Sequence, residues 1–326
     1  MLKLAALIVS ALLATGCTAD AGDDSTPMGG SEDDLTLRAG YKSLRTARDQ
    51  AVYTGIAVDG QSAYLASNDR TIDVVSLKTL KRTKTFSRIA AEALSFDGGK
   101  LVACGMRDDS PAGWPAPPSG GMANNYVVSF LDPSSGAVGK EIVLKLETYL
   151  GTSSSDGFVD LPNMSCKVSG GTITIGFAQE KLQHEIVSFE APRADKSVFD
   201  FREIPGATRT KVGKARRDRT ITGFAISAQN GLTLAAGGYG IDRVVGATTK
   251  ELRKAEPREH FVDLWDGGGA TLLAVDNDGA LLTLDAKTGK TLETTEIPDW
   301  LEGVTVRDGF AFVAGRKGIF IKKLAR

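Results

Sequence analysis

Residues 302–315, EGVTVRDGFAFVAG, combine two runs of alternating apolar residues with an Asp308–Gly309 turn between them. Alternation with a period of two is typical of β-strands, and Asp-Gly is a favoured two-residue hairpin turn. The stretch therefore predicts two short antiparallel strands. Residues 318–326, GIFIKKLAR, follow it and predict a third strand before the chain ends.

The same pattern recurs along the chain, at residues 54–67, 92–104, 164–177, 222–236 and 261–275. Aligned on the second predicted strand, the six segments place a small residue at one position: Ala66, Ala103, Gly176, Ala235, Ala274 and Ala314. A third strand with a polar turn follows each pair, at residues 71–81, 126–136, 185–195, 240–250, 280–290 and 318–326. Five of these run on into a fourth strand, whereas the last stops at the C-terminus.

Four short antiparallel strands in each of six repeats predict an all-β fold, a β-propeller of six four-stranded blades. The incomplete last blade needs an outer strand, and Leu35–Ala47 (LTLRAGYKSLRTA) can supply it and close the ring. We therefore expect one propeller domain over residues 35–326. Seven blades and a β-sandwich built from similar short strands are the alternatives.

Three quoted repeats carry a family resemblance: TIDVVSLKTLKRTKTF (71–86), LLAVDNDGALLTLDAKTGKTL (272–292) and GVTVRDGFAFVAGRKGIFI (303–321). They resemble the repeats of bacterial YVTN-type, LVIVD-type and quinoprotein-like propellers. Leu292 stands where quinoprotein repeats usually have tryptophan, and the chain has no vicinal cysteines. The resemblance therefore supports the fold, and no quinone or other cofactor is expected.

The N-terminus has the features of an export signal. Lys3 precedes a ten-residue, largely apolar stretch, LAALIVSALL (4–13), which is too short to span a bilayer but suits a signal peptide. Ala14-Thr15-Gly16-Cys17 then resembles the lipobox of bacterial lipoproteins, in which the cysteine carries the lipid. We expect a lipoprotein signal peptide at 1–16, lipidation of Cys17 and export to the envelope. An ordinary secretory cleavage site is the alternative.

Residues 18–34 hold six acids and no lysine or arginine, so they predict a disordered tether after the lipidated cysteine, with 17–34 as one segment. By resemblance, Thr18 after the cysteine favours the outer membrane, with the protein facing the periplasm or the cell surface. Without Lys3 and the six acids, 38 basic and 34 acidic residues remain, and the body is mildly positive. Cys104 and Cys166 either form a disulfide in this exported body or remain two buried thiols.

Catalytic signatures are absent from the sequence. His184 and His260 fall in different repeats, and no H-E-x-x-H, G-x-S-x-G or Walker A pattern occurs. Asp276-Asn277-Asp278-Gly279 has turn residues without the rest of an EF-hand loop, so no metal site is expected. We assign no catalytic residue. The alternative is an exported propeller enzyme, such as a lactonase-like hydrolase, which would need histidines and acids to converge.

Two charged residues, Lys167 and Asp263, fall in the middle of innermost strands. They align with Ala57, Ser95, Ala225 and Thr305 of other repeats. We expect them to line the central channel, where they either face water or orient a small ligand.

Three long insertions, 105–125, 148–163 and 205–219, are all second-to-third-strand or blade-to-blade connections, which share one face of a propeller. The last carries Arg209, Lys211, Lys214, Arg216, Arg217 and Arg219. Trp114, in the Pro-rich first insertion, suits an apolar anchor. Loops on a rigid scaffold often bind partners, although basic loops also simply keep a surface solvated.

These features together predict a membrane-anchored lipoprotein with a non-catalytic binding or scaffold role. The basic insertion favours an anionic partner: an acidic segment of an envelope protein, an anionic polysaccharide or lipid head groups. Nucleic acid is not expected, because the chain is exported and lacks the interleaved aromatic residues of a single-strand binder.

Overall fold

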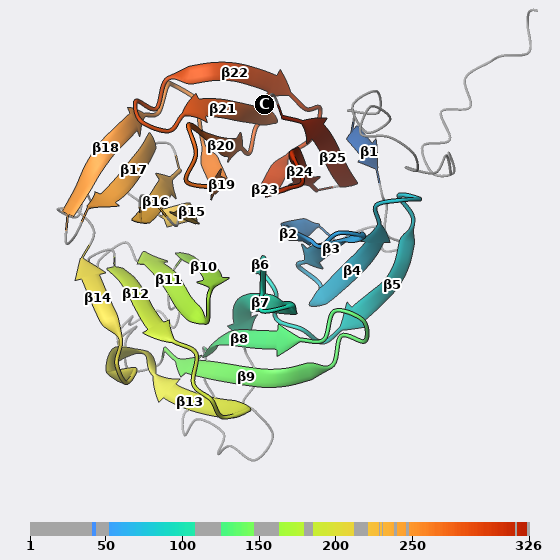
Figure 1. Ribbon diagram of the computed structural model, residues 1–326, viewed down its shortest axis with the longest axis vertical. Helices are drawn as coiled ribbons and strands as arrows, with labels where there is room; N and C mark the ends of the chain where they lie inside the picture. Colours follow the sequence, from blue (N-terminus) through green and yellow to red (C-terminus); the bar gives the residue numbers. More distant parts are fainter. Residues whose placement is uncertain are drawn as a thin grey trace, which may run out of the picture.

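The computed structural model describes residues 41–43, 52–107, 125–146, 163–178, 185–211, 221–227, 229, 231–237, 240–245, 248–316 and 318–324. Within these ranges the protein is an all-β propeller of six blades arranged in a ring (Figure 1). Each blade contains four antiparallel strands, and its first strand lies innermost. The predicted fold class is confirmed.

Blade 1 consists of β2 (Tyr53–Val58), β3 (Ser62–Ser67), β4 (Thr71–Ser76) and β5 (Arg82–Ser87). Blade 2 consists of β6 (Ala93–Asp97), β7 (Lys100–Arg107), β8 (Asn125–Leu131) and β9 (Val138–Lys145). Blade 3 consists of β10 (Asn163–Ser169), β11 (Thr172–Ala178), β12 (Glu185–Glu190) and β14 (Thr208–Lys211).

Blade 4 consists of β15 (Ile221–Ser227), β16 (Gly231–Ala236), β17 (Gly240–Val245) and β18 (Thr248–Lys254). Blade 5 consists of β19 (Phe261–Asp266), β20 (Thr271–Asp276), β21 (Ala280–Asp285) and β22 (Thr291–Glu296). Blade 6 has β23 (Leu301–Arg307), β24 (Phe310–Gly315) and β25 (Gly318–Lys323), and its fourth strand is β1 (Tyr41–Ser43).

Ring closure follows the expectation from the unfinished last repeat. β1 pairs antiparallel with β25, with Tyr41 opposite Phe320 and Ser43 opposite Gly318. A strand from before blade 1 therefore completes blade 6 and ties the N-terminal part of the domain to the C-terminal part (Figure 1).

Apolar residues fill the seams between blades. Six clusters of buried side chains lie one in each seam, and the one between blades 2 and 3 includes Tyr126, Phe177 and Phe201. The aligned small residues explain the close packing: Ala66, Ala103, Ala235, Ala274 and Ala314 are all fully buried. Gly223 shows the same constraint, because an added Cβ would lie 2.6 Å from the Cα of Asp263 in the next blade.

One strand pairs differently from the prediction. Residues 196–200 form β13 (Lys196–Asp200), which was expected to be the fourth strand of blade 3 but pairs parallel with β9 as a fifth strand of blade 2. A 3-10 turn, η1 (Phe201–Glu203), follows, and the fourth strand of blade 3 is instead β14, inside the predicted insertion 205–219. β13 occupies the outer edge that β9 would otherwise expose.

Candidate functional site

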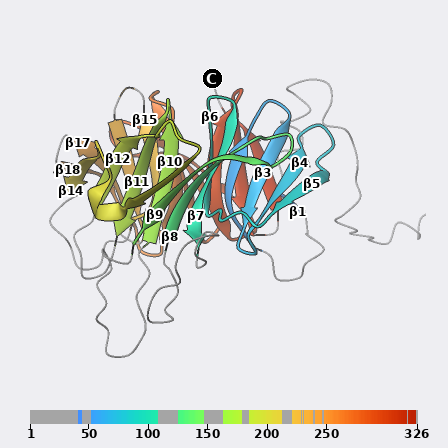
Figure 2. The same cartoon turned by 90° about the horizontal axis from the view of Figure 1, so that it is seen from below.

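The inner strands β2, β6, β10, β15, β19 and β23 surround an axial cavity of about 240 Å³. Its lining comes mainly from the residues at which these strands begin, including Thr54, Glu92, Thr222 and Glu302. A second cavity of about 260 Å³ lies at the ends of the same strands, and Lys167 lines both. The side view shows that the strands run from one face of the ring to the other (Figure 2).

Lys167 and Asp263, both expected in the channel, line the axial cavity and form an ion pair. Lys167 Nζ lies 3.8 Å from Asp263 Oδ1, and the side chains are 22% and 18% exposed. The backbone N–H of Val304 donates to Asp263 Oδ2 at 2.9 Å. Burial raises the pKa of the Asp263 carboxyl, while the nearby Lys167 ammonium acts in the opposite direction.

The sequence analysis placed Lys167 and Asp263 at the same position of their inner strands, and this alignment is wrong for Asp263. Lys167 lies opposite Thr174, whereas Asp263 lies opposite Val275, beyond the register irregularity between Phe261 and Asp263. Asp266, opposite Leu272, is the residue of blade 5 that matches Lys167. Asp263 therefore lies nearer the start of its strand, and the long lysine side chain spans the difference in depth.

Glu302 is a cavity-lining acid that the sequence analysis missed. The Nε–H of Arg316 donates to Glu302 Oε1 at 2.9 Å, and the Arg316 guanidinium stacks over Trp300 with 4.1 Å to the ring centroid. Burial raises the pKa of Glu302, and the hydrogen bond from Arg316 offsets part of that effect. Its place directly before Gly303, matching Thr54–Gly55 and Thr222–Gly223, is a signal in the sequence that could have identified it.

Glu92, also missed, differs from the other two acids of the cavity. The backbone N–H of Met106 donates to its Oε1 at 3.2 Å, and no described residue provides a cation partner. Its own backbone N–H donates to the carbonyl of Cys104 at 2.7 Å. The side chain is accessible to solvent, but the surrounding channel wall displaces water and raises the pKa of the carboxyl.

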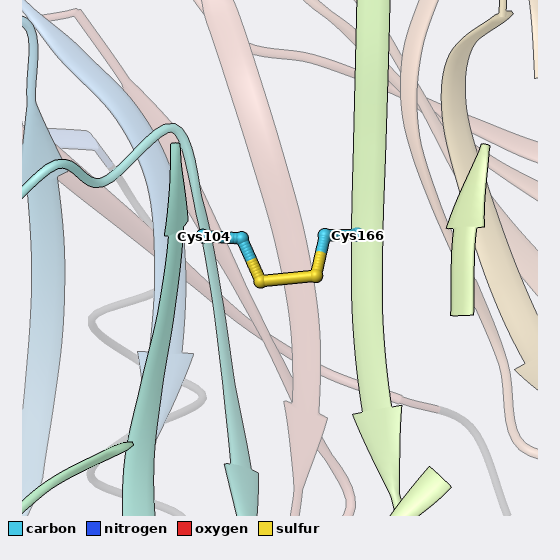
Figure 3. Close-up of a disulfide and its surroundings, with 2 residues drawn as sticks. All are labelled: Cys104 and Cys166. Atoms are coloured by element: carbon cyan, nitrogen blue, oxygen red, sulfur yellow. A yellow bond between two sulfur atoms is a disulfide. The ribbon is translucent and has the colours of Figure 1, made fainter. Parts of the chain in front are cut away.

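Cys104 and Cys166 are joined by a disulfide across the seam between blades 2 and 3 (Figure 3). Their Cα atoms are 6.2 Å apart, and both residues are buried. Cys166 also lines the axial cavity. The bond therefore lies directly behind the cavity wall, beside Glu92 on one blade and Lys167 on the next.

The strand ends that flank the three predicted insertions lie on one face of the ring. These ends are Arg107 and Asn125, Lys145 and Asn163, and Lys211 and Ile221. The axial cavity with Glu92 and Glu302 opens on this same face, which we call the insertion face. The opposite turn face holds the first-to-second turns, which span only two to four residues.

Several predicted site residues lie outside the described part of the chain: Cys17, Trp114, Lys214, Arg216, Arg217, Arg219 and His184. Arg209 and Lys211 are described, and they do not belong to a loop, because both lie in β14. Arg209 Nη1 donates to Glu185 Oε2 at 2.7 Å, and its guanidinium stacks over Phe201. Arg209 therefore holds β14 and η1 together, whereas Lys211 is exposed.

The described histidine, His260, lies away from the axial cavity. It lines a separate open cleft of about 910 Å³ with Glu256, Glu259 and Asp278. Its backbone N–H donates to Asp276 Oδ2 at 2.6 Å, and burial raises the pKa of that carboxyl. Among the described residues, no three His, Cys, Asp or Glu side chains are grouped closely enough to hold a metal ion.

None of the described segments forms a helix with the length and apolar character needed to cross a bilayer.

Comparison with known proteins bears on the fold. No model of a known protein family matches the chain, and no curated protein matches it significantly. The computationally designed Ika8 protein is similar in structure, with a TM-score of 0.49 and 12% identity, over 87% of this chain and 100% of that one. BamB from Moraxella catarrhalis has a TM-score of 0.42 and 12% identity, over 89% of this chain and 90% of that one. These similarities concern the fold alone.

Proposed function

We propose that the chain is an exported lipoprotein, anchored through Cys17 and a tether over 17–34, whose propeller is a non-catalytic binding module for an envelope partner. The anchor holds the domain in the cell envelope, at the outer membrane and facing the periplasm or the cell surface. The relation to YVTN-type and LVIVD-type propellers is part of the same proposal. This family relation rests on the three repeats quoted above, at residues 71–86, 272–292 and 303–321.

The observation that carries the binding role is the difference between the two faces. On the insertion face, the chain leaves the described strands for 17 residues between β7 and β8 and for 17 residues between β9 and β10. The first-to-second turns of the opposite face span two to four residues. The long connection between β12 and β14 on the turn face contains β13, which is folded against blade 2. The strand ends that flank the long segments thus share one face with the axial cavity.

The charge of the third segment suggests the chemistry of the partner. Residues 212–220, between β14 and β15, contain Lys214, Arg216, Arg217 and Arg219 against Asp218. Lys211, exposed at the end of β14, extends this positive charge onto the described surface. We propose an acidic segment of an envelope protein as the partner, with an anionic polysaccharide or anionic lipid as the alternatives.

Reversal of charge at Arg216 and Arg217 tests this proposal. The double variant Arg216→Glu, Arg217→Glu should weaken capture of the native partner roughly tenfold at low salt. The loss should shrink near 1 M salt, where the Debye length is only about 3 Å. Trp114→Ala should weaken capture with little salt dependence, because it removes apolar contact. Pull-down from envelope extracts at several salt concentrations measures both effects.

The matched control reverses two exposed cations of the turn face, Lys100→Glu with Arg193→Glu. This control should leave capture unchanged. Capture that survives the insertion-face substitutions but is lost in the control would show that the partner binds the turn face.

A further inference from the structure

The charges around the axial cavity do not balance. Asp263 is paired with Lys167 and Glu302 with Arg316, at 3.8 and 2.9 Å. Glu92 is the lining acid for which the described residues offer no cation. With these five groups ionised, the wall carries one excess negative charge, and it is located at Glu92.

Hydrogen bonds to the neighbouring strand β7 hold Glu92 in position. Its backbone bonds to Cys104, its carboxylate accepts from Met106, and Cys104 is cross-linked to Cys166 of the next blade. A carboxylate held in this way loses little freedom when a ligand binds, so the site is preorganised.

A buried hydroxyl group near Glu92 lacks a hydrogen-bond partner among the described residues. Tyr126 in β8 is fully buried, and its hydroxyl has no hydrogen-bond partner among the described residues. Buried hydroxyl groups normally have one. Tyr126 lies opposite Met106, whose N–H holds the Glu92 carboxylate, and the charge of Glu92 adds to the burial that raises the pKa of Tyr126. A buried hydroxyl without a partner thus lies behind the cavity wall at Glu92, in the core between blades 2 and 3.

The rest of the lining suits an alkyl chain. Ile56, Leu94, Met164, Phe224 and Val262 contribute apolar atoms to the cavity. The hydroxyls of Thr54 and Thr222 are already used, because they donate to the carbonyls of Ala91 and Phe261 in the next blade. A volume of about 240 Å³ equals that of roughly eight water molecules at ~30 Å³ each, which is enough for a short-chain amine.

We propose that the axial cavity binds a small organic monocation, a primary alkylammonium, whose charged end pairs with Glu92 while its chain lies against the apolar wall. The site uses residues of the inner strands and Glu92, which directly precedes β6. It therefore does not depend on the lipid anchor or on the partner of the insertion face.

Calorimetric titration of the purified full chain with n-butylammonium tests the site. n-Butylammonium should bind, whereas n-butanol, which has the same chain without the charge, should bind at least tenfold more weakly. Glu92→Gln, which keeps the shape of the side chain, should weaken n-butylammonium binding at least tenfold. Glu190→Gln, at an exposed acid of the turn face, should leave it unchanged.

Titration with Nα-acetyl-lysine methylamide separates the two sources of such an ammonium group. Preference for this compound would assign the site to a lysine side chain of a protein, and preference for n-butylammonium to a free amine. The melting temperature of the Glu92→Gln variant should not fall below that of the wild type. The neutral amide avoids the desolvation cost that the charged carboxylate has at this position. No binding by the wild-type chain, or binding that Glu92→Gln leaves unchanged, would overturn the proposal.

Discussion

Replacement of Cys17 by serine should move the protein from the membrane fraction to the soluble fraction. Serine cannot form the thioether that carries the lipid, and the described part of the chain has no helix able to cross a bilayer. Because several acyl chains give stable anchoring, we expect the relocation to be nearly complete. Fractionation with immunoblotting measures it, and mass spectrometry of the N-terminal peptide should show that the acyl mass disappears.

Ser10→Ala, within the apolar run but distant from the cysteine, is a suitable control and should remain in the membrane fraction. A wild-type protein that is already soluble, with an unmodified N-terminal cysteine, would contradict the lipoprotein proposal. It would favour the ordinary secretory cleavage site instead.

Removal of the disulfide should produce the largest loss of stability. Cys104 and Cys166 are 62 residues apart, and a cross-link that closes a loop of this length stabilises the folded state by about 4 kcal/mol in the chain-entropy model. The double variant Cys104→Ala, Cys166→Ala should therefore melt roughly 10 °C below the oxidised wild type. Thermal melting monitored by circular dichroism gives the value.

Two comparisons make this test specific. Reduction of the wild type should lower the melting temperature similarly without any change of side-chain volume, and the double variant should not respond to reductant. Free thiols at both positions in protein purified from the envelope, or equal melting temperatures with and without reductant, would show that the bond does not stabilise the protein.

The repeat pattern was sufficient to predict the ring. The small residues from Ala66 to Ala314 mark the second strand of every blade, and their burial in the structure shows why larger side chains do not fit there. The three predicted strands of the last repeat pointed to a fourth strand near the N-terminus, and β1 pairs with β25 as expected. Both inferences rest on local alternation and on the need to close the edges of a sheet, which a single sequence contains.

Strand pairing and register were harder to predict. The repeat predicts a fourth strand after residues 185–195 but does not say which neighbour it joins, and β13 (Lys196–Asp200) joins blade 2 instead of blade 3. The irregularity at Phe261 and Asp263 shifts the register, so that Asp263 lies at a different depth from Lys167. Arg209 appeared to belong to a basic loop because its partners, Glu185 and Phe201, come from other elements.

The acids of the axial cavity show a further limit of the sequence. Glu92 resembles any polar residue just before a strand, and only the ring brings it to a shared wall with Glu302, Lys167 and Asp263. The pairing of two of these acids, and the lack of a cation at the third, depends on distances between different blades.

Crosslinking from the two faces of blade 3 tests most directly whether the insertion face binds the partner. Lys211 and Glu190 are both exposed, and they lie at opposite ends of this blade, in β14 and β12. A photo-crosslinking amino acid at Lys211, introduced into the anchored protein in its own cells, should capture the partner, whereas the same group at Glu190 should not. Capture at Glu190 with none at Lys211 would contradict the proposed binding face.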